Sequence, residues 1–188
     1  SEMCIRDRVI SVMLPTFETV RLILKPRTID DLESCIEMDI APQVTEYIPG
    51  EWNGSYEHLT FLKERILKSY PSGLGYWSIF SKENPINFLG WIHLLPVKDD
   101  RQATEIGWRL KYSAWGNGYA TEAAQVIIAH AFSIADFNRI VAYTHSANNR
   151  SIKMMNRLGL KYIDDLIYNG KTPSLFYEIR REKYYQKE

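Results

Sequence analysis

The chain has 188 residues, of which 45% are hydrophobic, so it is long enough for one domain that buries a full core without disulfides or metals. It carries 23 basic and 23 acidic side chains, and its formal net charge at pH 7 is zero. A chain without net charge lacks the overall field that recruits nucleic acid or an anionic membrane surface, so neither is expected as a partner. A small or peptide-like ligand is the better expectation.

Cysteine and histidine usage predicts neither disulfides nor a metal site. Cys4 and Cys35 have no spacing that is typical of metal ligands or of a disulfide framework, which favours a reducing compartment. The four histidines form no metal-binding pattern; they are His58, His93, His130 and His145. No apolar run approaches the roughly 18 residues that span a bilayer, and the first residues lack a signal-peptide pattern. We therefore expect a cytoplasmic protein without a membrane segment.

The first residues differ from the rest of the chain. Arg6, Asp7 and Arg8 interrupt any apolar pattern there, so we interpret residues 1–15 as an appended or disordered leader. No internal repeat, low-complexity tract or linker occurs between Thr16 and Tyr185, and we expect residues 16–188 to form one domain.

The first elements of that domain are a strand and two helices. Residues 20–24 form a strand-like run, and Thr28 has the residue type of a helix N-cap before a stretch with helical spacing of apolar residues. Ser55 is expected to cap a second helix that runs to about Lys68. The loop between the two helices is marked by Pro42, Pro49 and Gly50.

Strands dominate the remainder. Three strand candidates joined by polar turns predict an antiparallel meander; they are residues 76–80, 86–97 and 103–110. After a long helix, residues 139–144 form a short strand, Asn148 or Asn149 starts a helix that ends at Gly159, and two last strands flank Asn169-Gly170. This order predicts an α/β (α+β) domain with a mixed, mostly antiparallel twisted sheet of about six to seven strands and helices on both faces.

A glycine-containing segment, Trp-Gly-Asn-Gly-Tyr-Ala-Thr at residues 115–121, lies between the strand of residues 103–110 and the long amphipathic helix. Gly116 and Gly118 allow the backbone to turn tightly and approach a ligand, and the helix that follows offers unpaired amides and a positive dipole end. A Walker loop would need a Lys-Ser/Thr pair after its second glycine, and a dinucleotide fold would need three spaced glycines. Because neither is present, an ATP-binding domain is the weakest interpretation, and we expect main-chain amides to hold a phosphate group.

This segment resembles the pyrophosphate loop of the GNAT acetyltransferases, Gln/Arg-x-x-Gly-x-Gly/Ala, with Trp115, Gly118 and Ala120 at the marked positions. Trp115 departs from the Gln or Arg of most members, and the whole segment resembles the RimJ/RimL-like branch. The resemblance covers nearly the whole chain after Pro15 and is carried by further segments in the family's order: Phe17 to Pro26, Asp30-Asp31-Leu32, Asn148-Asn149-Arg150-Ser151 and Arg157-Leu158-Gly159-Leu160.

The resemblance implies a GNAT-like fold and acetyl-CoA as cosubstrate, with no metal. The residues that it implies for acetyl-CoA binding are the loop and its two flanks: Leu110, Trp115, Gly116, Asn117, Gly118, Tyr119, Ala120, Thr121 and Asn148. A backbone N–H around Leu110 is the implied donor to the reaction's oxyanion, and Asn148 is the implied pantetheine contact. Leu110 has the alternative role of a core residue, and Asn148 that of a helix cap.

Two side chains are candidates for proton transfer. Strand alternation puts Glu105 on the same face as Gly107 and Arg109, and Gly107 is expected to leave open space beside Glu105. The resemblance implies that Glu105 is the base for the amine, the alternative being an ion pair. Many relatives have a tyrosine at the position of Met155 to protonate the thiolate, so Ser151 is the remaining candidate, unless it only satisfies backbone groups of its helix.

The predicted activity is acyl transfer by an N-acetyltransferase, directly from acetyl-CoA to a primary amine. A protein N-terminal α-amine is the favoured acceptor, because its pKa of about 7.7 to 8.0 leaves part of it neutral at pH 7, whereas deprotonating a lysine costs about 4.6 kcal/mol. The alternatives are a small-molecule amine (an antibiotic, polyamine or amino acid) and a non-catalytic acyl-CoA-binding regulatory module. Tyr47 and Trp52 are candidates for acceptor contact, and either a monomer or a homodimer is compatible with the sequence.

Overall fold

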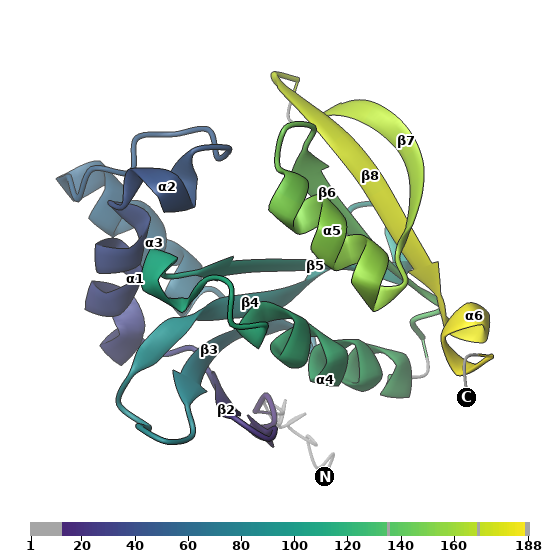
Figure 1. The fold of residues 1–188 in the computed structure, drawn as a ribbon, viewed down its shortest axis with the longest axis horizontal. Coiled ribbons are helices and arrows are strands. Elements are labelled where there is room, and N and C mark those ends of the chain that lie inside the picture. Colours follow the sequence, from purple (N-terminus) through teal and green to yellow (C-terminus); the bar gives the residue numbers. More distant parts are fainter. Residues whose placement is uncertain (1–12, 135, 169, 187–188) are drawn as a thin grey trace, which may run out of the picture.

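The computed structural model describes residues 13–134, 136–168 and 170–186. One twisted sheet of eight strands runs through the molecule, and helices cover both of its faces (Figure 1). The predicted fold class is confirmed. The sheet has eight strands where about six to seven were expected, and the two-residue β1 (Phe17–Glu18) adds an edge strand.

The first part of the chain follows the predicted order. Thr28 is the N-cap, and its N–H donates to Asp31 Oδ2 at 3.0 Å, while Ser55 Oγ accepts from the His58 N–H at 3.3 Å. The loop between the predicted helices contains an extra turn, since Pro42 has the backbone angle that starts a helix. The elements are β2 (Leu22–Pro26), the 3₁₀ turn η1 (Ile29–Asp31), α1 (Leu32–Asp39), α2 (Pro42–Thr45) and α3 (Tyr56–Leu67).

The predicted meander is confirmed as three antiparallel strands, and the later elements also follow the predicted order. Gly159 ends α5 in the left-handed conformation, with a φ of 90°. These elements are β3 (Gly75–Ser81), β4 (Phe88–Val97), β5 (Asp100–Leu110), the 3₁₀ turn η2 (Tyr112–Ala114), α4 (Tyr119–Ser133), β6 (Arg139–His145), α5 (Asn149–Leu158), β7 (Lys161–Tyr168), β8 (Thr172–Arg180) and α6 (Arg181–Tyr185).

Strand order in the sheet is β1-β2-β3-β4-β5-β6-β8-β7. All neighbouring strands are antiparallel except β5 and β6, which are parallel and joined through α4. The last hairpin therefore folds back so that β8, not β7, pairs with β6. The parallel pair in the middle of the sheet is the feature that positions the site.

The two faces of the sheet carry separate cores, as side-chain alternation requires. Trp77 and Ile92 belong to a large cluster that includes the buried face of α4, whereas Tyr76 and Trp91 belong to a smaller cluster with α1 and α3. Small residues line α4 where it contacts the sheet, which permits close packing. These fully buried residues are Ala123, Ala124 and Ala131.

The described residues begin at Met13, so most of the predicted leader, including Cys4, lies outside them. The last two residues assigned to that leader contact the domain. Leu14 packs against the larger core cluster, and the carbonyl oxygen of Pro15 accepts from Trp77 Nε1 at 2.8 Å. Across the described residues, no helix has the length and apolar character needed to cross a membrane.

Gly90 on β4 provides a stability test of the central meander. Its φ is 150°, and a Cβ there would lie 2.2 Å from the carbonyl oxygen of Arg109. Since that neighbour is backbone, Gly90→Ala should lower the free energy of unfolding by about 2 kcal/mol or more. Denaturant unfolding measures this loss. Gly170→Ala is the control, because its φ of 70° is also left-handed but a Cβ there would meet nothing within 4 Å; an equal loss in both variants would contradict the crowding.

Candidate active site

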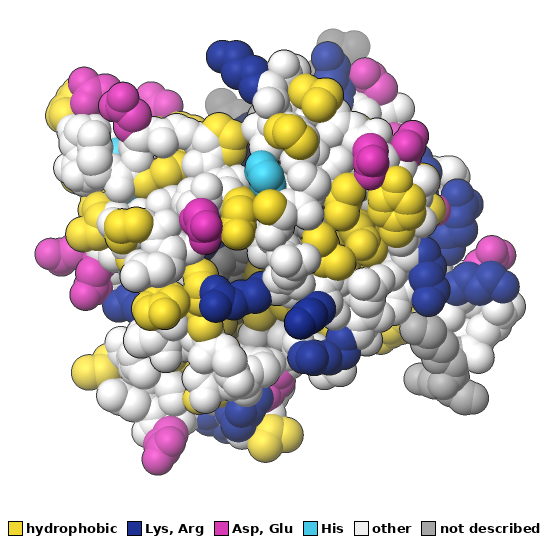
Figure 2. All heavy atoms as spheres, turned by 45° about the horizontal axis from the view of Figure 1, so that its top comes forward, with side chains coloured by type: hydrophobic (Ala, Val, Ile, Leu, Met, Phe, Trp, Pro, Cys, Tyr) yellow, Lys and Arg dark blue, Asp and Glu magenta, His cyan; other side chains and the backbone are white. Residues whose placement is uncertain are grey.

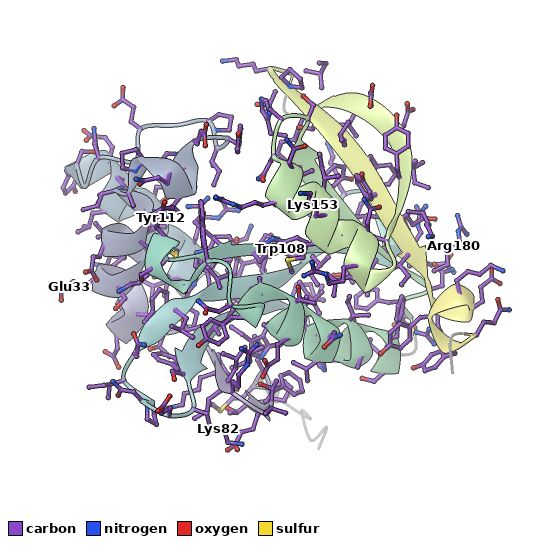
Figure 3. All side chains as sticks on the ribbon, viewed as in Figure 1. Glu33, Lys82, Trp108, Tyr112, Lys153 and Arg180 are labelled. Atoms are coloured by element: carbon purple, nitrogen blue, oxygen red, sulfur yellow. The ribbon has the colours of Figure 1, made fainter. Side chains whose placement is uncertain are left out.

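The site begins where β5 and β6 separate. The two strands pair only at Ala103↔Arg139, Thr104↔Ile140 and Glu105↔Val141. Beyond Glu105 they enclose a cavity of about 240 Å³. Its walls come from β5, β6, α5 and the loop after α2, through Ile106, Trp108, Tyr143, Thr144, Asn148, Ser151, Met155, Tyr47 and Pro49 among others. Figure 3 shows Trp108 in the middle of the molecule, between α4 and α5.

A second cavity of about 180 Å³ continues from the first toward α3. The residues that line both are Trp91, His93, Glu105, Arg109 and Tyr168. Glu105 therefore stands where the two cavities meet, with 23% of its side chain exposed. A carboxylate in this position can exchange a proton with a group bound on either side.

His93 lies beside Glu105, with 3.8 Å between His93 Nε2 and Glu105 Oε1. Burial lowers the pKa of His93 and the nearby carboxylate only partly offsets this, so the imidazole is neutral at pH 7. Gly107 lies directly opposite His93, and a Cβ on Gly107 would be 2.6 Å from His93 Nε2. The expectation that Gly107 provides the open space beside Glu105 is therefore wrong, because the missing side chain of Gly107 makes room for the His93 ring.

The backbone of β5 also contributes to the first cavity. The Lys111 N–H donates to the Leu89 carbonyl of β4 at 2.8 Å. Because amides along an antiparallel strand alternate in direction, the Arg109 N–H also faces β4, whereas the Trp108 N–H points to the side where β6 has separated. Leu110 has the same direction as Trp108, but it is buried in the core and lines neither cavity.

The predicted phosphate loop has the backbone that its glycines suggested. Gly116 and Gly118 have φ values of 77° and 78°, and Gly118 is the N-cap of α4 without any side-chain cap. The first helical hydrogen bond runs from the Glu122 N–H to the Gly118 carbonyl at 3.0 Å. The amides of Tyr119, Ala120 and Thr121 therefore precede it and are available to an anion. A Cβ on Gly116 would meet nothing within 4 Å, so the space beside the loop is open.

The polar side chains of the loop donate hydrogen bonds to backbone carbonyls in or near the loop and so stabilise its conformation. Trp115 Nε1 donates to the Leu110 carbonyl at 3.0 Å, and the Asn117 side-chain amide donates to the carbonyls of Ala114 and Trp115. The Arg150 guanidinium lies 4.1 Å above the Trp115 ring. This arrangement leaves phosphate binding to the main-chain amides, as expected from the sequence.

Arg21 and Glu122 connect the loop to β2, and sequence reasoning missed this pair. The Arg21 guanidinium donates to the Asn117 carbonyl at 2.9 Å and pairs with Glu122 at 2.7 Å. Burial alone would raise the pKa of Glu122, but hydrogen bonds from Thr19 and Arg21 outweigh it and hold the pKa below its ordinary value. One signal in the sequence could have indicated the pair. Glu122 lies in the first turn of a helix whose N-cap, Gly118, has no side chain to cap it.

The other predicted residues lie along the first cavity. Asn148 Oδ1 accepts from the Ser151 N–H at 3.2 Å and so caps α5, while both residues also line the cavity beside Met155. The alternatives weighed for Asn148 are thus compatible with each other. Tyr47 lines the first cavity and Trp52 the second.

Two tyrosines in the walls were not singled out from the sequence. Tyr143 on β6 and Tyr168 on β7 lie with their ring centroids 5.4 Å apart, and both line the first cavity. Burial raises the pKa of Tyr143, so its phenol stays protonated at neutral pH. The two strands come together only through β8, which explains why the sequence did not reveal the pair.

The family profile described as "Acetyltransferase (GNAT) domain" matches residues 21–161, which include β5, the phosphate loop and α5. The chain belongs to the GNAT acetyltransferase family. It is therefore an acyltransferase that uses acetyl-CoA as cosubstrate, and the open cavity and unpaired loop amides fit that cosubstrate. Among the described residues, no three His, Cys, Asp or Glu side chains are grouped as metal ligands would be.

Relatives of this GNAT chain differ in what their names say they act on. It is 28% identical to the FsC-acetyl coenzyme A-N(2)-transacetylase of Aspergillus fumigatus, over 90% of this chain and 78% of the relative. A spermidine N-acetyltransferase from Vibrio cholerae superposes with a TM-score of 0.72 at 16% identity, over 89% of this chain and 99% of that one. The ribosomal-protein-S5-alanine acetyltransferase from Vibrio fischeri gives 0.73 at 16% identity, over 90% and 98%. Structural similarity at this level of identity shows the fold alone. Members of the RimJ/RimL-like branch are among several kinds of acetyltransferase that share it.

The pair of Arg21 and Glu122 is expected to support acetyl-CoA binding by holding the loop. Glu122→Gln removes the charge that fixes Arg21 and should weaken acetyl-CoA binding about fivefold, as measured by calorimetry. The matched control is Glu57→Gln, which changes a first-turn glutamate of α3. Equal affinities for wild type and Glu122→Gln would contradict a role of the pair in loop geometry.

The lowered pKa of Glu122 also predicts a pH dependence of stability. A carboxyl whose pKa is depressed by folding contributes stability above its ordinary pKa, and this contribution is lost as the pH falls through the folded value. The difference in unfolding free energy between wild type and Glu122→Gln should therefore shrink from about pH 6 to about pH 3. Urea unfolding across this range measures it. A difference that grows on acidification would have the wrong sign.

Proposed function

We propose that this GNAT protein transfers acetyl directly from acetyl-CoA to a primary amine, with Glu105 as the base and no covalent enzyme intermediate. The observation that carries the proposal is the place of Glu105, which lines both cavities at the point where β5 leaves β6. In this scheme the coenzyme's diphosphate binds the amides after Gly118, and its thioester arm enters the first cavity along α5. The acceptor amine approaches Glu105 from the second cavity.

The chemistry follows from these positions. Glu105, directly or through a water, takes a proton from the amine, whose nitrogen then attacks the thioester carbon. The Trp108 N–H is the proposed donor to the oxyanion, in place of the Leu110 N–H, because it points into the first cavity. Collapse of the tetrahedral intermediate breaks the carbon–sulfur bond and releases the thiolate, and the extra proton on the nitrogen passes to water as the amide forms.

Protonation of that thiolate is a small requirement. If its pKa is near that of cysteine, about 8.5, leaving unprotonated at pH 7 costs only about 2 kcal/mol. Ser151 stays the proposed donor from α5, and the Tyr143 phenol on β6 is a second donor that lines the same cavity. Met155 at the position of the family's tyrosine is therefore compatible with turnover.

The proposed acceptor is an α-amine, as at a protein N-terminus. Its lower pKa asks less of the base than a lysine or polyamine nitrogen does. A small-molecule amine remains the alternative within the same chemistry. The predicted cytoplasmic location and the choice between monomer and homodimer stay predictions.

Glu105→Gln tests the base. The variant should keep acetyl-CoA affinity, because Glu105 lies away from the phosphate loop, and lose about 100-fold in kcat/KM for α-amine acceptors. Release of free CoA thiol measures turnover, and calorimetry measures binding. Glu83→Gln, in the exposed turn before β4, is the control substitution.

The same experiment separates enzyme from regulatory module. A non-catalytic acyl-CoA-binding protein would bind acetyl-CoA and acetylate no amine in either form. A Glu105→Gln variant with wild-type turnover would leave transfer intact but contradict the role of this carboxylate.

A further inference from the structure

The second cavity is rich in arginine. Three arginines line it, Arg27, Arg65 and Arg109, against one carboxylate, Glu105. A cavity with this balance attracts an anion more than a cation. The distribution of partners among these arginines decides which of them are available to a ligand.

Arg109 has a partner of its own. Its Nη1 donates to Asp39 Oδ1 at 2.7 Å, and the fully buried Asp39 accepts a second bond from His58 Nε2 at 3.3 Å. The Gly54 N–H donates to His58 Nδ1, so the proton of the neutral ring is on Nε2 and faces Asp39. Asp39 therefore compensates the charge of Arg109 and holds its side chain along the cavity wall. Arg109 Nε has no hydrogen-bond partner among the described residues.

Arg27 has no such compensation. Within the described part of the chain it forms no ion pair, and its buried Nε and Nη2 have no hydrogen-bond partner. The guanidinium lies 3.7 Å above the Tyr76 ring and close to the thiol of Cys35. Burial lowers the pKa of Arg27, as expected for a cation removed from water without a carboxylate beside it.

A third residue, Trp91, also has a donor without a partner, its Nε1. Trp91 is 8% exposed and lines the cavity, and its Nε1 has no hydrogen-bond partner among the described residues. The Arg27 and Arg109 guanidinium carbons lie 5.9 Å and 5.1 Å from the centroid of the Trp91 ring. Buried donors without partners are costly, so four such atoms on three residues around one cavity indicate that a ligand supplies the acceptor atoms.

From these unpaired donors, we infer that the second cavity binds a carboxylate carried by the acceptor, which holds the acceptor's amine against Glu105. The inference rests on the proposed function and narrows its substrate class to amines that bear a carboxylate. The planar fork of an arginine matches a carboxylate geometrically. A polyamine would instead bring further positive charge to Arg27 and Arg65, and among the described residues Glu105 is the only carboxylate that lines that cavity.

The shared chemistry has two sources, a free amino acid and a peptide whose first residue is acidic. The test therefore uses two matched pairs in which amides replace carboxylates: glutamate against glutamate diamide, where both carboxylates are replaced, and the dipeptide Asp-Ala amide against Asn-Ala amide, where one is replaced. In the wild-type protein the acid member of the relevant pair should have a kcat/KM at least tenfold higher than its amide. The pair that shows the larger ratio identifies the source.

Arg27→Gln assigns the ratio to this cavity. The variant should lose at least fivefold more kcat/KM on the acid than on the amide, mainly through KM, and Arg27→Lys should restore only part of the difference because the fork is lost. Lys25→Gln on β2 is the control, since Lys25 is exposed and does not line the cavity. Melting temperatures verify that the variants are folded. The acid-to-amide ratio of the wild-type protein tests the carboxylate site even if a variant fails to fold.

A second readout separates this inference from the proposed function. Calorimetry with the acids and amides in the presence of CoA measures binding without turnover. Acid-selective binding that Arg27→Gln abolishes, in a protein that acetylates no amine, would retain the carboxylate site and overturn the transferase proposal. Turnover with acid-to-amide ratios near one, or ratios that Arg27→Gln leaves unchanged, would overturn the carboxylate site alone.

Discussion

The early separation of two parallel strands organises this molecule. β5 and β6 share three residue pairs and then diverge, which leaves strand amides such as that of Trp108 without a neighbouring strand. Unpaired backbone groups inside a sheet are unfavourable unless a ligand or water satisfies them. The divergence therefore creates the cavity and also the demand for a ligand in it. Glu105 is the last residue of β5 that pairs with β6, so the paired part of the sheet holds it at the edge of this opening.

Two polar networks fix the surroundings of the opening, one on each face of the sheet. On the α4 side, Arg21 and Glu122 anchor the phosphate loop to β2. On the α1 and α3 side, Asp39 holds Arg109 in the second cavity. Both networks join residues far apart in the chain, so the sheet and its helices must be assembled before either forms. Charged side chains near the centre of the face in Figure 2 include both signs, in keeping with a chain of zero net charge.

Local patterns were enough to predict most of the fold and part of the site. Thr28, Ser55 and Gly159 mark helix ends through interactions with residues close in sequence, and the turn signals between 76 and 110 required an antiparallel meander. The two-residue β1 was missed because so short a strand has no periodicity. Gly107 was misread because the ring that fills its space comes from the neighbouring strand.

The sequence by itself determined the glycine loop, its helix and the position of Glu105 on a strand, because turns, caps and alternation depend on residues within a few positions of one another. Only the tertiary structure places Glu105 beside His93 and joins Arg21 to the loop by a hydrogen bond. It also brings Arg27, Trp91 and Arg109 to the wall of one cavity. These contacts join strands and helices that are distant in sequence. Their geometry depends on strand register and on the place where β5 leaves β6, and no local pattern records either.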